Sequence, residues 1–66
     1  MHITLNGQKK EIVPSQNLRE VVGRFAASSA VLIVEVNGAI VKKDRWDEIP
    51  VKDGDTIELV SFVGGG

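Results

Sequence analysis

The residues with the clearest chemical potential are the glycines that end the sequence, Gly64, Gly65 and Gly66. If the chain ends at Gly66, its last group is a free carboxylate on a segment without side chains. Three extended residues reach at most about 10 Å, enough to enter a narrow channel in another protein. Glycine suits such a channel because it has no Cβ to clash with the walls. We expect this tail to be a handle that another enzyme modifies.

Catalysis by the chain itself finds little support. The absence of cysteine excludes disulfides, a thiolate nucleophile and Cys-ligated metals. The serines lack a plausible base, because the single histidine, His2, has no evident carboxylate to orient it and fits a solvent-facing position. Asp53 and Asp55 flank Gly54, and we interpret them as turn residues bonded to local backbone N–H groups rather than as metal ligands. We therefore expect that this chain is not an enzyme and that it binds no cofactor or metal.

The segment that must position the tail is the last predicted strand, residues 56–63. Ile57 and Leu59 fit its core-facing positions. Strand alternation then places Glu58, Val60 and Phe62 on the opposite face. Exposed apolar side chains leading into the tail indicate a docking patch for a partner. The alternatives are a strand covered on both faces by its own domain, and a frayed glycine terminus.

Two Asn-Gly pairs, Asn6-Gly7 and Asn37-Gly38, predict tight hairpins, because both residue types accept positive φ. The strands that they join are residues 1–5 with 8–13, and 31–36 with 39–41. We expect residues 8–13 to form an edge strand, since their charges protect an edge from further pairing. Residues 31–36 are nearly all apolar and β-branched, which is typical of a central strand covered on both faces.

A helical pattern separates the hairpins. One apolar stripe is formed by Leu18, Val21, Val22 and Phe25. Asn17 with Glu20 matches a capping box, and the helix should fade through residues 26–29. Residues 42–48 are charged except for Trp46, which could lie in the core or at its rim, and Asp44 is predicted to cap a short helical turn there.

Length and element order together predict the fold. The 66 residues, 42% of them hydrophobic, fit one small domain. Strand pairs around one helix predict an α+β fold, a ubiquitin-like β-grasp with a mixed sheet packed on one main helix. We assign residues 1–63 to this domain and 64–66 to a flexible tail. The net charge of −1 argues against a nucleic-acid or membrane-surface protein, and without a signal peptide or membrane-spanning run we expect a cytoplasmic location.

The chain also resembles the ThiS family, the sulfur carrier proteins of thiamine biosynthesis, over essentially its whole length. The matching segments are residues 3–7, 17–22, 34–38, 51–59 and 62–66, of which Gly65-Gly66 is the most specific. The resemblance implies that a ThiF-type adenylyltransferase uses ATP to adenylate Gly66. A sulfur donor such as a cysteine desulfurase would then form a thiocarboxylate, which thiazole synthase would receive. Gly64 and Gly65 would let the tail thread the partners' sites, and the free chain would be a monomer.

Three other functions remain open at this point. The small subunit of molybdopterin synthase has the same fold and Gly-Gly end but tends to be longer, so the length favours the thiamine route. A protein-conjugating ubiquitin-like modifier would join Gly66 to partner lysines and give a ladder of covalent conjugates in cells. For a passive β-grasp adaptor the tail would be irrelevant.

Overall fold

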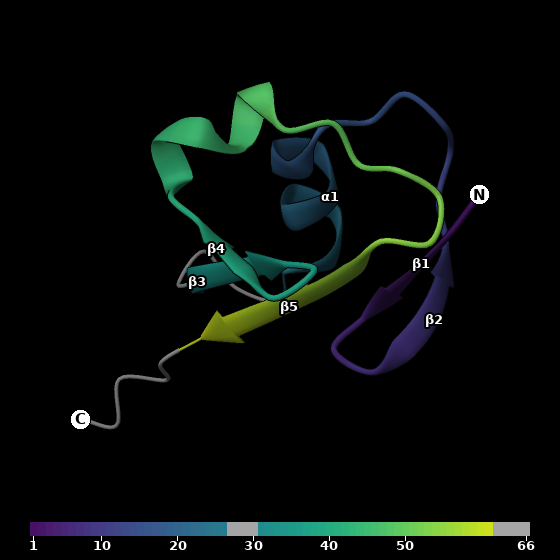
Figure 1. Cartoon of the computed structure of the whole chain (residues 1–66), viewed down its shortest axis with the longest axis horizontal. Coiled ribbons are helices and arrows are strands. Elements are labelled where there is room, and N and C mark those ends of the chain that lie inside the picture. Colours follow the sequence, from purple (N-terminus) through teal and green to yellow (C-terminus); the bar gives the residue numbers. More distant parts are fainter. Residues whose placement is uncertain (27–30, 62–66) are drawn as a thin grey trace.

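The computed structural model describes residues 1–26 and 31–61 (Figure 1). Its strands are β1 (His2–Leu5), β2 (Gln8–Glu11), β3 (Val31–Val36), β4 (Ala39–Val41) and β5 (Thr56–Ser61). Its helices are α1 (Leu18–Phe25) and the 3₁₀ helix η1 (Lys43–Glu48). The element order agrees with the order predicted from the sequence.

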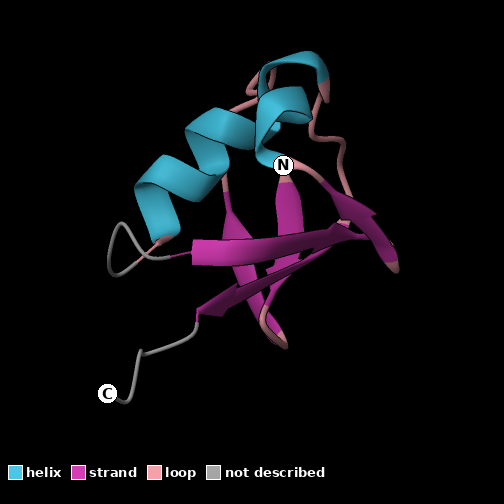
Figure 2. Ribbon diagram, turned by 90° about the vertical axis from the view of Figure 1, so that its left-hand side faces the viewer, coloured by secondary structure: helices cyan, strands magenta, loops and turns pink. Residues whose placement is uncertain are grey.

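The described strands form one mixed sheet in the order β2-β1-β5-β3-β4. The β1–β5 pair is parallel, and the other pairs are antiparallel. The prediction of residues 31–36 as a central strand is confirmed, since β3 lies between β5 and β4, but the prediction that this strand is covered on both faces is wrong. The middle strand is β5, and the helices lie on one side of the sheet (Figure 2). Val34 is fully buried on that side, whereas Glu35 on the other face is only half-buried.

Both predicted hairpin turns are present. Positive φ angles occur at Asn6 (48°) and Gly7 (80°), and again at Asn37 (52°) and Gly38 (86°). These angles are typical of a type I′ turn, whose backbone twist matches the twist of the flanking strands. Strand β2 ends at Glu11 rather than at residue 13. Beyond the His2–Glu11 pair, only Met1 and Ile12 still exchange backbone hydrogen bonds, because the described residues begin at Met1 and offer Val13 no partner there.

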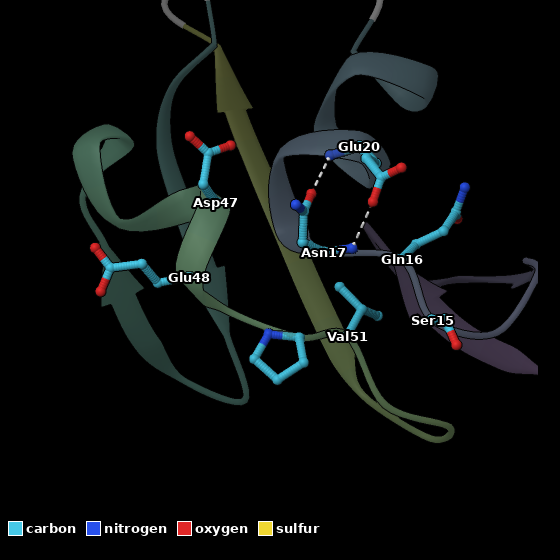
Figure 3. Close-up of a pocket in the computed structure, with 8 residues that line it drawn as sticks. Ser15, Gln16, Asn17, Glu20, Asp47, Glu48 and Val51 are labelled. Atoms are coloured by element: carbon cyan, nitrogen blue, oxygen red, sulfur yellow. Dashed lines mark hydrogen bonds between the residues drawn. The ribbon is translucent and has the colours of Figure 1, made fainter.

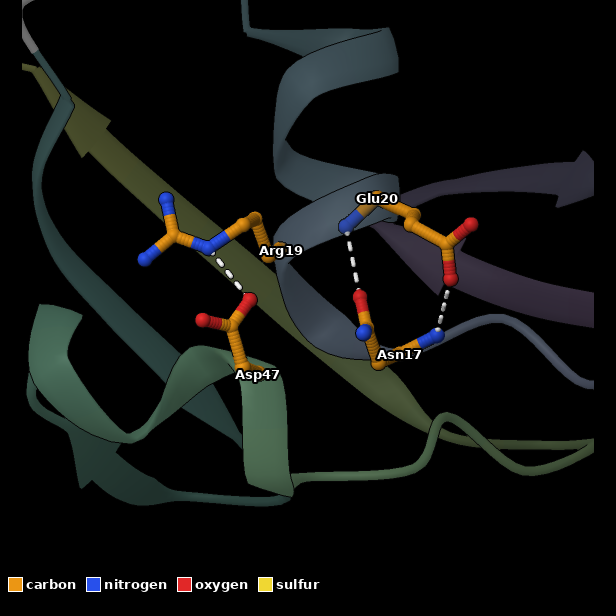
Figure 4. Close-up of polar contacts among 4 residues, drawn as sticks. All are labelled: Asn17, Arg19, Glu20 and Asp47. Carbon is orange, nitrogen blue, oxygen red and sulfur yellow. Dashed lines mark hydrogen bonds and ion pairs between the residues drawn. The ribbon is translucent and has the colours of Figure 1, made fainter.

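The helix α1 begins with the predicted capping box (Figure 4). The Asn17 Oδ1 atom accepts the Glu20 N–H at 2.9 Å, and Glu20 Oε1 accepts the Asn17 N–H at 2.9 Å. These bonds satisfy two of the backbone donors that a helix start leaves without partners. Ala26 is the C-cap, and the remainder of the segment predicted to fade, residues 27–29, lies outside the described residues.

The core fills the space between the sheet and the helices. Its buried side chains include Ile3, Leu5, Leu18, Val21, Val22, Val34, Trp46, Val51 and Ile57. Trp46 is therefore a core residue, and its Nε1 donates to the Val41 carbonyl at 3.0 Å. The prediction that Asp44 caps this helical turn is wrong: the N-cap is Lys42, without a side-chain cap bond, and Asp44 lies within the first turn. No helix in the described part of the chain has the length and apolarity needed to cross a membrane.

Candidate functional site

Strand β5 leads to the glycines and is held from both sides. The parallel pairing with β1 covers only its first residues, through Thr4–Thr56 and Leu5–Ile57. The antiparallel pairing with β3 continues as far as Ser61. The second half of β5 therefore depends on β3 for its strand pairing, since β1 ends at Leu5.

Asn6 extends the support of β5 beyond the end of β1. Its Oδ1 accepts the Leu59 N–H at 2.7 Å, and its Nδ2 donates to the Leu59 carbonyl at 3.3 Å. The side-chain amide thus bonds to the backbone as a neighbouring strand residue would. We call this pair of bonds the Asn6 clip. The sequence predicts only the turn at Asn6, because Leu59 lies far away in the chain.

Asn37 makes a comparable contact at the start of β5. Its Oδ1 accepts the Thr56 N–H at 2.9 Å, and its Nδ2 donates to Asp55 Oδ1 at 3.0 Å. Both hairpin asparagines thus bond to the backbone of β5, Asn37 at its first residue, Thr56, and Asn6 at Leu59. Together they hold the strand that precedes the tail.

The two faces of β5 differ as the alternation predicts. Ile57 is fully buried and Leu59 packs against the core. Glu58 is exposed, and Val60 is 39% exposed, on the face that points away from the helices. Phe62, the third predicted docking residue, lies outside the described residues, as do the glycines 64–66. The prediction of an outward face is confirmed for Glu58 and Val60.

Neighbouring strands extend this outward face. On β3, Glu35 pairs with Glu58 and Ile33 pairs with Val60. On β4, Ile40 pairs with Glu35 and is 66% exposed. Ile33, Glu35 and Ile40 could not be assigned to the site from the sequence, because strand order and register decide which residues share a surface.

The other candidate residues do not form a catalytic arrangement. His2 Nε2 lies 3.8 Å from Glu11 Oε1, and both side chains are more than half exposed. A carboxylate that sequence analysis had not found thus lies near the histidine, but this exposed pair has no described serine bonded to it. No cluster of three or more His, Asp or Glu side chains that could hold a metal occurs among residues 1–26 and 31–61.

Asp53 and Asp55 stabilise the turn before β5. Asp55 Oδ2 accepts the Lys52 N–H at 2.8 Å, as predicted for a local turn bond. Asp53 Oδ1 instead accepts the N–H of His2 at 2.8 Å, which joins the turn to β1. The prediction of a local partner is therefore wrong for Asp53, because the parallel pairing brings the N-terminal strand beside this turn.

A depression of about 370 Å³ lies at the start of α1 (Figure 3). It is lined by Ser15, Gln16, Asn17, Glu20, Asp47, Glu48, Pro50 and Val51. Asn17 and Glu20 already bond to each other's backbone in the capping box, and Asp47 pairs with Arg19 (Figure 4). Asn17 and Glu20 thus cap α1, and Asp47 joins η1 to α1, so we assign the depression to the fold.

The mixed sheet packed on a helix defines a ubiquitin-like β-grasp domain, in which β5 leads to a glycine-rich end. The sequence profile of the ThiS family matches residues 3–66. The chain belongs to the ThiS family. A crystal structure of a thiamine biosynthesis protein (ThiS) from Geobacter metallireducens superimposes with a TM-score of 0.81 and 34% identity, over the whole of both chains.

Two curated relatives are also similar to this chain. The sulfur carrier protein ThiS of Bacillus subtilis is 37% identical over 49 residues, which cover 74% of each chain. A thiazole synthase from Paramagnetospirillum magneticum is 33% identical over all 66 residues of this chain. The chain spans only 20% of the length of that thiazole synthase.

Proposed function

We propose that this protein carries sulfur for thiamine biosynthesis as a thiocarboxylate on Gly66. The observation that carries the proposal is the family match, which continues through the β-grasp domain to Gly66 itself. The curated relative from Bacillus subtilis is named a sulfur carrier protein. The proposed chemistry needs ATP from a partner, in agreement with the cytoplasmic location that we expect.

The first proposed step is adenylation by a ThiF-type adenylyltransferase. A free carboxylate is a poor electrophile, because neither oxygen is a good leaving group. Attack of a Gly66 carboxylate oxygen on the α-phosphorus of ATP forms an acyl-adenylate and releases pyrophosphate. ATP belongs to the partner's site, and this chain binds no cofactor in the scheme.

In the second step a sulfur nucleophile attacks the acyl carbon. With hydrosulfide as the nucleophile, a C–S bond forms, the bond to the phosphate oxygen breaks, and the products are a thiocarboxylate and AMP. A cysteine desulfurase is the class of enzyme that we expect to supply the sulfur, as a persulfide. Two equivalents of a thiol reductant release this sulfur as hydrosulfide and are oxidised to a disulfide. Gly64 and Gly65 add no side chains, so the tail can pass through narrow partner sites.

The proposed acceptor of the sulfur is thiazole synthase. In Paramagnetospirillum magneticum, a segment similar to this whole chain forms part of a longer protein named thiazole synthase. Joining two sequences in one polypeptide raises their effective concentration, which is useful when they act in turn. This similarity supports thiazole synthase as the partner that uses the thiocarboxylate.

We place docking of the adenylyltransferase on the outward face of β5. Glu58 and Val60 are exposed there, and Phe62 follows in the sequence with the same alternation. Aromatic and apolar anchors of this kind often dominate the affinity of interfaces. Docking beside the tail would fix the distance over which Gly66 must reach.

The tail can be tested by changing its length. The parent, incubated with the cognate adenylyltransferase, ATP and a sulfur source, should gain the mass difference between one sulfur and one oxygen. Deleting Gly66 should abolish this gain, because it moves the carboxylate by up to about 3.6 Å. Appending one alanine after Gly66 should do the same, since it adds a methyl group and displaces the carboxylate.

Both variants should melt at the temperature of the parent, because the tail follows the strand that completes the core. Intact-mass spectrometry against time provides the rate. A variant that accepts sulfur at the parent's rate would contradict threading of the tail. A parent that never gains sulfur under these conditions would contradict the proposed function.

A further inference from the structure

Two carboxylates lie directly opposite each other on the sheet face that points away from the helices. Glu35 of β3 is the register partner of Glu58 of β5. Directly paired residues of an antiparallel sheet have Cβ atoms about 4.5–5.5 Å apart, and like charges at such positions destabilise the sheet. We call these residues the glutamate pair. The glutamate pair therefore lowers the stability of the sheet locally, and such local losses of stability are common at binding sites.

Neither member of the glutamate pair forms an ion pair with another described residue. The ion pairs among the described residues are His2–Glu11, Arg19–Asp47 and Arg45–Glu48, and none includes Glu35 or Glu58. Along the strands, the next residues on the same face are Ile33, Val60 and Thr56; across the sheet, the flanking residues are Ile40 and Asn6. The exposed cations Lys9 and Lys42 form no ion pair with either glutamate.

The glutamate pair has an apolar surround. Ile40 is 66% exposed and Val60 is 39% exposed, and Ile33 is half-buried between them in the sheet. A partner that covers these aliphatic groups must also remove water from the glutamates. Removing water from carboxylates without a compensating cation is strongly unfavourable. The partner must therefore bring a positive group to this point.

A guanidinium group fits the site better than an ammonium group does. It is planar, more weakly hydrated, and presents five N–H donors in a fixed fork. Such a group can donate to two carboxylates at once, and its face can lie against aliphatic side chains.

We propose that the glutamate pair binds an arginine side chain of the adenylyltransferase, with Ile33, Ile40 and Val60 packing around it. The inference rests on the proposed function, since it takes the partner to be the enzyme that adenylates Gly66. A second copy of this chain is a poor occupant. A two-fold symmetric contact through this face would place one glutamate pair against another.

The test compares Glu35→Gln, Glu58→Gln and the double variant with the parent in calorimetric binding to the cognate adenylyltransferase. Glu11→Gln is the matched control, because it makes the same change on the same face of the sheet but at its far edge. Each single variant should raise Kd about tenfold, as for loss of one partner from a covered charge pair, and Glu11→Gln should not. Added salt should weaken binding of the parent more than that of the double variant.

Adenylation kinetics separate this inference from the proposed function. Because the glutamate pair does not touch the reacting atoms, the variants should show a raised KM and the parent's kcat. If the variants bind and react like the parent while the parent is adenylated, the inference fails and the proposed function stands. If the parent is not adenylated, both fail. If the parent dimerises in sedimentation and the double variant does not, the pair belongs to a self-contact and the inference is overturned.

Discussion

Asn6 shows how one residue can serve the turn and the site at once. At φ 48° it supplies the positive dihedral that the hairpin needs, and its amide forms the Asn6 clip on Leu59. Few residues combine tolerance of positive φ with both a donor and an acceptor on a short side chain. The clip continues the support of β5 past Leu5, where β1 ends.

Replacing Asn6 by glycine isolates the clip from the turn. Glycine adopts positive φ without strain, so the hairpin is kept while both bonds to Leu59 are lost. We expect Asn6→Gly to reduce the free energy of unfolding by about 1–2 kcal/mol, since an exposed hydrogen bond contributes roughly 0.5–1.5 kcal/mol. Chemical denaturation of the parent and variant provides the measurement.

Asn6→Asp is the control, because aspartate also tolerates positive φ and keeps the oxygen that accepts the Leu59 N–H. In moderate salt, which screens Glu58, it should lose less stability than the glycine variant. Equal stability of Asn6→Gly and the parent would show that the clip does not support β5.

Among the elements, α1 has one face buried in the core and one face exposed. Leu18 and Val21 are fully buried and Val22 is 5% exposed, whereas Gly23 lies on the exposed face with open space around its Cα. A smaller side chain on the buried face would leave a cavity and lose packing contacts, whereas a methyl group at Gly23 on the exposed face would contact no neighbouring atom. Adjacent substitutions in this helix should therefore change stability in opposite directions.

We expect Val22→Ala to destabilise the domain by about 1–3 kcal/mol, through lost burial and the cavity that remains. Gly23→Ala should stabilise it by about 0.5–1 kcal/mol, because alanine loses less backbone entropy in a helix. Thermal melts of both variants measure the two effects. If Gly23→Ala is the more damaging change, the helix does not face the core as described.

The elements were largely predictable, and their arrangement was less so. The Asn-Gly turns, the capping box of Asn17 and Glu20, and the apolar stripe of α1 are local patterns, so the sequence displays them directly. The choice of β5 as the middle strand depends on contacts between distant segments. For the same reason the pairing of Glu35 with Glu58, and the bond from His2 to Asp53, could not be predicted.

At the scale of the whole molecule, packing and proposed chemistry occupy different regions. The buried side chains lie between the sheet and the helices, whereas Glu35, Glu58 and Val60 lie on the other face of the sheet. A domain of 66 residues is stable by only a few kcal/mol, so substitutions at a functional site within the core would unfold it. This separation allows variants of the outward face and tail to change function while the fold persists.

In the proposed function, Gly66 alone carries the sulfur. The most direct measurement is fragmentation mass spectrometry of the chain after reaction with its adenylyltransferase, ATP and a sulfur source, with the thiocarboxylate first trapped by alkylation. We expect an ATP-dependent label confined to Gly66, which disappears when thiazole synthase and its other substrates are added. Sulfur attached to any other residue, or an unmodified Gly66 in a chain that still supports thiazole formation, would contradict the proposed function.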